Sequence, residues 1–95
     1  MKILGYDYCI VKCDAPDWIG GFGRHHPKSQ SIQIASEMHE QEAISTLLHE
    51  IIEALNYHLQ LSLSHPTIMS LEAGLFQVLT DAGVDLSSLI KGIEQ

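Results

Sequence analysis

The sequence predicts an α+β fold in which a small antiparallel sheet of two to three strands comes first and two long helices follow. Residues 3–13 carry β-branched and aromatic side chains in loose alternation, and residues 31–35 alternate with a period of two, which is typical of strands. Residues 40–60 and 66–82 instead repeat their apolar side chains every three or four positions, as amphipathic helices do. Strands that precede helices in this way are the order of an α+β layout.

The first predicted strand ends at Pro16 and Asp17, and a glycine-rich and proline-containing stretch follows it. The second strand, "SIQIA", places Ile32 and Ile34 on one face, and residues 21–25 are expected to form the other arm of a hairpin with it. The same stretch carries Trp18 and Phe22. These two rings either line a substrate cleft or close one end of the small core.

The two cysteines, Cys9 and Cys13, lie on the first predicted strand. Residues four apart on a strand share a face but are separated by about 13 Å. They are therefore too far apart to bind one metal ion or to form a disulfide with each other. We interpret them as small apolar side chains in a reducing compartment.

The second half of the chain predicts two helices and a short third one. Residues 61–64 interrupt the helical pattern, and Pro66 suits the first position of the next helix. Gly83 is a plausible C-cap for that helix, and Asp85 is suited to cap a short last helix, "LSSLIKGIE".

Length and charge limit the function classes. The 95 residues predict a single domain, 1–95, which is either a monomer or a homodimer that gains core by association. The formal net charge is −7, with five basic against twelve acidic residues, so neither nucleic acid nor an anionic membrane is expected as a partner. The chain contains neither a long apolar segment nor a signal-peptide pattern, and a cytoplasmic location is therefore expected.

The stretch "LLHEIIEAL" opens like the zinc-protease helix motif H-E-x-x-H but has Glu53 at the position of the second histidine. His49 and Glu53 are one helical turn apart and therefore share a face. That face lies nearly opposite the apolar side of the helix. It is either a metal site or an ordinary solvated stripe.

The second long helix contributes a further acidic residue. On a helical wheel Glu72 lies about 40° from Ile68, inside the apolar arc that also holds Leu71, Leu75 and Val78. An ionised carboxylate in such a place is costly unless it is paired or bound to a cation. His65 lies two turns earlier and points in nearly the same direction.

These residues predict a metal site with His49, Glu53 and Glu72 as ligands and His65 as a reserve ligand. Zinc often binds three such protein ligands, and Glu50 would then be the general base. Two carboxylate ligands lower the Lewis acidity of the ion and favour harder ions such as manganese, so the expected cofactor is Zn²⁺ or another divalent metal. Without a metal, Glu72 would pair with a histidine or with Tyr57, and His65 would cap its helix.

The other histidines are not expected to be ligands. His25 and His26 fall in a predicted turn, and His39 and His58 are expected on the surface.

Three segments together resemble the small phage and prophage zincin-like proteins related to the ImmA/IrrE metallopeptidase group. They are the "SIQIA" strand, the helix "TLLHEIIEALNY" and the helix "HPTIMSLEAGLFQVLTDAGVDL". The resemblance implies a zincin-like fold, a metal site completed by Glu72, and a place in the cytoplasm of a bacterium or of a phage-infected cell. The chain departs from the family pattern at Glu53, where the family has histidine.

Two functions are therefore expected as alternatives. The first is a zinc-dependent peptidase, a hydrolase in which Glu50 moves the proton and an edge strand at residues 31–35 holds an extended peptide or protein substrate. The second is a non-catalytic acidic phage or prophage module on the same fold that binds another protein.

Overall fold

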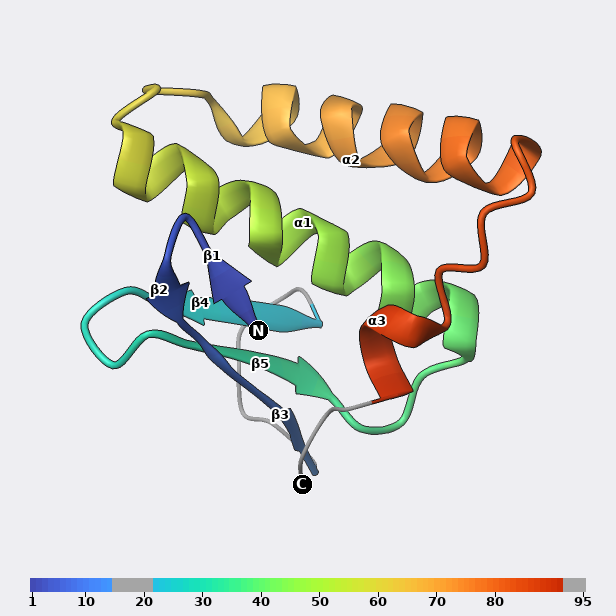
Figure 1. The fold of residues 1–95 in the computed structure, drawn as a ribbon, viewed down its shortest axis with the longest axis horizontal. Helices are drawn as coiled ribbons and strands as arrows, with labels where there is room; N and C mark the ends of the chain where they lie inside the picture. Colours follow the sequence, from blue (N-terminus) through green and yellow to red (C-terminus); the bar gives the residue numbers. More distant parts are fainter. Residues whose placement is uncertain (15–21, 92–95) are drawn as a thin grey trace.

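The structure of the protein is a computed structural model that describes residues 1–14 and 22–91 (Figure 1). Within these residues, five strands precede three helices, as the α+β prediction requires. The elements are β1 (Lys2–Ile3), β2 (Tyr6–Asp7), β3 (Cys9–Cys13), β4 (Gly23–His26), β5 (Ser31–Ala35), α1 (Glu40–Leu59), α2 (His65–Asp81) and α3 (Ser88–Lys91).

The first predicted strand is divided into three. Leu4 and Gly5 have φ angles of 52° and 84°, and this pair of left-handed residues reverses the chain between β1 and β2. A two-residue turn with two positive φ angles matches the twist of a hairpin. Cys9 and Cys13 lie at the two ends of β3 and are free thiols, which agrees with the predicted separation.

The main sheet has the strand order β3-β5-β4. β4 runs antiparallel to β5, and this pair is the predicted hairpin. β3 runs parallel to β5, so the prediction of a wholly antiparallel sheet is wrong for this pair. β5 has a partner on both sides, and the prediction that residues 31–35 form an edge strand is therefore also wrong. Among the described strands of this sheet, β4 is an edge.

The core lies between the sheet and α1, which crosses one face of the sheet in Figure 1. Ile32 and Ile34 share that face, as predicted, and both are completely buried together with Leu47 of α1. α2 forms a further layer on the other side of α1 and packs, among the described elements, against α1 alone.

The ends of α2 follow the predicted signals, but its apolar face does not. Ser64 caps the helix by accepting a hydrogen bond from the Thr67 amide, and Gly83 adopts a left-handed φ of 80° just beyond the last turn. Ile68 is buried, whereas three other apolar residues of the same predicted arc remain 44–58% exposed, namely Leu71, Leu75 and Val78.

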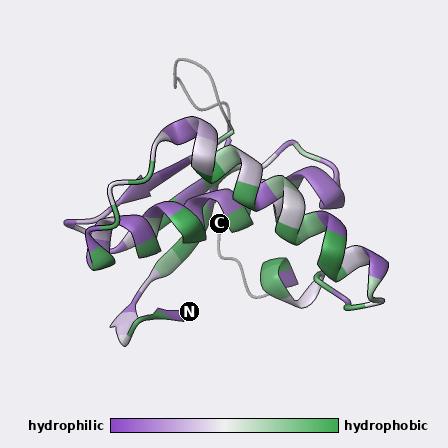
Figure 2. Cartoon of the chain, turned by 90° about the horizontal axis from the view of Figure 1, so that it is seen from above, coloured by the Kyte–Doolittle hydropathy of each residue, from purple (hydrophilic) through white to green (hydrophobic). Residues whose placement is uncertain are grey.

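The expectation that the apolar arc of α2 is buried is therefore wrong for these three residues. A helix that contacts a single neighbour can bury only a narrow stripe. In Figure 2 hydrophobic and hydrophilic residues alternate along both long helices. None of the described helices has the length and apolar composition that crossing a membrane requires.

Candidate metal centre

A cleft of about 740 Å³ opens between β4, α1 and α2. Residues 22–26 line it from the sheet, and side chains of the two long helices line it from the other side. Five of the latter are the residues that the sequence singled out, namely His49, Glu50, Glu53, His65 and Glu72. The fold therefore brings every predicted site residue to one cleft.

His49 lies between two carboxylates. Its Nε2 is 3.4 Å from Oε2 of Glu53, and its Nδ1 is 3.5 Å from Oε1 of Glu72. The His49 side chain is only 14% exposed, because α2 covers the face of α1 that a solvated stripe would leave open. The approach of Glu72 to His49 agrees both with the predicted metal cluster and with the alternative of an intramolecular pair.

His65 approaches the same carboxylate from the first turn of α2. Its Nδ1 is 3.8 Å from Oε2 of Glu53, and its ring centroid is 5.1 Å from that of His49. One ligand atom from each of His49, Glu53 and His65 lies within 4.8 Å of the other two. The predicted reserve ligand thus belongs to the compact group, whereas Glu72 contacts the opposite ring nitrogen of His49.

Glu72 is placed to orient His49. A carboxylate that accepts the second N–H of a metal-binding histidine fixes the tautomer and the direction of the ring. Ser45 of α1 in turn donates its hydroxyl hydrogen to the other oxygen of Glu72. The arrangement Ser45–Glu72–His49 therefore leaves Nε2 of His49 directed toward Glu53 and available to a cation.

Glu50 lies at the side of the cleft that faces β4. It is 7% exposed, and a Cβ atom added at Gly23 would lie only 3.1 Å from its Cγ. Burial in the first place, and the negative charge of Glu53 in the second, raise the pKa of Glu50 to about 7, while the charge of Arg24 acts in the opposite direction. A carboxyl group that gains and loses a proton near neutral pH is suited to general acid–base chemistry.

Three predictions about the histidines are wrong. His25 and His26 lie in β4 rather than in a turn, and both line the cleft. The Nε2 of His58 is 2.6 Å from the hydroxyl oxygen of Tyr8 rather than at the open surface. Residues two apart on a strand share a face, so the packing of Gly23 against Glu50 places His25 on the same side. The sequence alone did not indicate which side of this strand faces the helices.

The remaining candidates lie away from the metal group or outside the described residues. His26 interacts with Gln33 and His39 is exposed beside the first turn of α1. Phe22 lines the cleft, as one of its two interpretations required, while Trp18 lies outside the described residues.

No protein-family model matches the chain, and neither a curated protein nor a solved structure matches it. The fold and the site define it as a small α+β protein with a candidate cation-binding cleft.

Proposed function

We propose that the chain is a metal-dependent peptidase of the zincin-like type, in which the cleft binds a divalent cation through His49, Glu53 and His65. The observation that carries the proposal is the convergence of these three ligand atoms. They lie beside Glu72, whose Oε1 is 3.5 Å from the other ring nitrogen of His49. The resemblance to phage and prophage zincin-like proteins of bacterial cytoplasm supports the same assignment.

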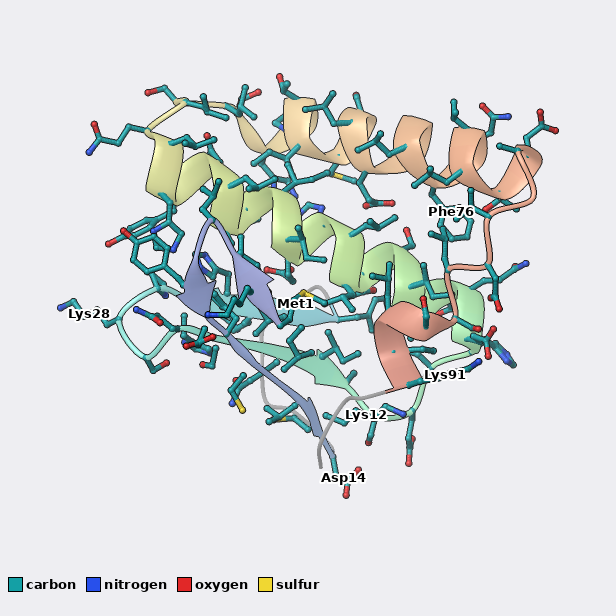
Figure 3. The ribbon with its side chains drawn as sticks, viewed as in Figure 1. Met1, Lys12, Asp14, Lys28, Phe76 and Lys91 are labelled. Atoms are coloured by element: carbon teal, nitrogen blue, oxygen red, sulfur yellow. The ribbon has the colours of Figure 1, made fainter. Side chains whose placement is uncertain are left out.

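The charge distribution around the cleft favours a cation. Glu50, Glu53 and Glu72 line one cleft, and three acidic groups in partly buried surroundings repel one another when ionised. Figure 3 places Lys12, Lys28 and Lys91 away from the space between α1 and α2. Arg24 lines the cleft and offsets part of this charge, and a bound divalent ion would offset the rest.

The donor set fits zinc. Two imidazole nitrogens and one carboxylate oxygen are a common catalytic zinc set that leaves a fourth position open. The motif has Glu53 where a zinc protease has its second histidine. In this donor set His65 of α2 would supply the second imidazole instead. The chemistry that such an ion supplies is Lewis acidity toward a carbonyl oxygen.

The protein's own groups account for the other requirements of peptide hydrolysis. Glu50 would take the proton of the attacking water and return it to the leaving amine. β4 would hold an extended substrate by strand addition, since it lies at the edge of the sheet and its residues line the cleft. Glu72 would keep His49 in the tautomer that leaves Nε2 free.

A second candidate function is a non-catalytic module that binds another protein. It is favoured by the exposed apolar residues Leu71, Leu75 and Val78, which share the apolar arc of α2. Exposed apolar side chains that gather on one surface are typical of interaction sites. In this case a metal ion would stabilise the fold without supporting hydrolysis.

Elemental analysis of protein purified without added metal, followed by titration of metal-free protein with Zn²⁺ and with Mn²⁺, tests the metal site. We expect one equivalent of ion in the wild type and none in His49→Ala. Glu72→Gln is expected to weaken binding about 10- to 100-fold, as loss of an outer carboxylate partner does. His39→Ala is the matched control, because His39 is exposed and lies outside the cleft. Equal metal binding by wild type and His49→Ala would refute the site.

Hydrolysis is tested separately with a peptide library and the metal-loaded protein. Chelator-sensitive cleavage that is lost in Glu50→Gln supports the peptidase. Stoichiometric metal with no cleavage of any peptide would refute the peptidase and leave the interaction module.

A further inference from the structure

A cluster of three polar rings adjoins the cleft at β4. The hydroxyl oxygen of Tyr8 is 2.7 Å from Nε2 of His25 and 2.6 Å from Nε2 of His58. Tyr8 is 3% exposed, so little of its side chain reaches bulk water. The stacking of Tyr6 on His58, with ring centroids 4.1 Å apart, holds the outer imidazole in place.

The hydrogen-bond inventory of this cluster restricts the tautomers of the two imidazoles. A phenol carries one proton, so Tyr8 donates to one Nε2 and accepts a hydrogen bond from the other. One of the two histidines must therefore carry a proton on Nε2, and the other must present a lone pair there. Two neutral imidazoles with identical tautomers do not satisfy both short contacts.

The position of His58 decides the direction. His58 lies in the last turn of α1, where the negative end of the helix dipole favours a side chain that presents hydrogen-bond donors. His58 is therefore the donor to Tyr8, and Tyr8 donates to Nε2 of His25. Burial, and then the neighbouring charge of His58, lower the pKa of His25, which agrees with a neutral ring at this position. The single proton of neutral His25 then lies on Nδ1.

We propose that His25 is a substrate-binding residue of the cleft, with an Nδ1–H group that donates to a carbonyl oxygen of a bound peptide and a tautomer that Tyr8 and His58 hold. His25 lines the cleft, and its Nδ1 has no hydrogen-bond partner among residues 1–14 and 22–91. It shares a face of β4 with Gly23, one strand repeat of about 7 Å away, where Glu50 packs. The choice of a peptide as the ligand rests on the proposed function. The tautomer of His25 does not depend on it.

The tautomer is measured by long-range ¹H–¹⁵N correlation spectroscopy on the metal-free protein near pH 7.5. We expect His25 to carry its proton on Nδ1 in the wild type, and to shift toward the Nε2–H form in Tyr8→Phe, which keeps the ring in the core. His58→Gln is the conservative variant, because its amide N–H still donates to Tyr8, and it should keep the wild-type tautomer. The signals of His39 serve as the internal control. An Nε2–H tautomer of His25 in the wild type, or no change in Tyr8→Phe, overturns the proposal.

The ligand is tested by titration of the same labelled protein with a capped alanine–glycine hexapeptide, which offers backbone carbonyl groups and no charged side chain. We expect the Nδ1–H signal of His25 to move, and the affinity to fall about 5- to 10-fold in Tyr8→Phe, the size of one neutral hydrogen bond. Chemical-shift changes at other cleft residues without a change at His25 would overturn this proposal while leaving the proposed function intact. Absence of any peptide binding would count against both the peptide-binding role of His25 and the proposed peptidase. The tautomer measurement would still decide whether Tyr8 and His58 hold the Nδ1–H form of His25.

Discussion

Replacement of Glu50 by glutamine is expected to stabilise the metal-free protein at alkaline pH. Burial and the charge of Glu53 raise the pKa of Glu50 from 4.5 to about 7 in the folded state. Below pH 4.5 the carboxyl group is protonated in both the folded and the unfolded chain, and it imposes no penalty. Between pH 4.5 and 7 the unfolded chain loses the proton while the folded chain keeps it, so the free energy of unfolding falls as the pH rises.

The size of the effect follows from this difference in pKa. At about 1.4 kcal/mol for each pKa unit, the rise from 4.5 to about 7 gives a penalty of about 3.5 kcal/mol above pH 7, and water that enters the cleft reduces it. Glutamine has nearly the same shape and no charge. The variant should therefore match the wild type near pH 4 and exceed its free energy of unfolding by about 2–3 kcal/mol at pH 8.

Urea unfolding followed by circular dichroism at pH 4, 6 and 8, with chelator present, measures this difference. Glu37→Gln is the matched control, because Glu37 is exposed ahead of α1 and its variant should follow the wild type at every pH. A Glu50→Gln protein that is less stable than the wild type at pH 8 would refute the reasoning. It would mean that the folded state holds an ionised and well-paired carboxylate at this position.

Three further predictions concern packing and metal binding. Gly23→Ala should lower the free energy of unfolding by about 1–3 kcal/mol in the same assay, because the added Cβ would lie 2.7 Å from Cγ2 of Thr46. An unchanged free energy of unfolding would show that β4 is free to move away from α1. Ile68→Ala should cost about 2–4 kcal/mol and Leu75→Ala less than about 1, since the first is buried and the second is 45% exposed. Equal costs would mean that Leu75 is covered as well. Zn²⁺ at about 100 times its dissociation constant should raise stability by about 2.7 kcal/mol in thermal unfolding, and a chelator should reverse the change; an unaltered transition would argue against a site in the folded state.

The helices could be predicted closely because their signals are local. The spacing of apolar residues, Pro66 at the start of α2 and Gly83 beyond its end act within a few residues of the structure that they determine. The same holds for His49 and Glu53, which share a face because they are one turn apart. A helix-breaking or capping residue acts whatever the rest of the chain does.

The strand order could not be predicted in the same way. Both edges of β5 carry backbone groups that can pair, and the pattern of "SIQIA" is the same whether one or two neighbours use them. The exposure of Leu71, Leu75 and Val78 on α2 also depends on whether another element packs against them, which the sequence of α2 does not determine. Periodicity identifies a face that can be buried, and only the neighbouring elements decide whether it is.

By itself the chain determined which residues are helical, that Ile32 and Ile34 face one way, and that an imidazole and a carboxylate lie side by side on α1. Only the tertiary structure decided that His65 joins them and that Glu72 contacts the other nitrogen of His49. It also brought Tyr8 to His25 and His58, which are 17 and 50 residues away along the chain. Local spacing sets the direction of a side chain from its own backbone, whereas contacts between distant residues depend on how the helices and strands pack, and packing is a property of the whole fold.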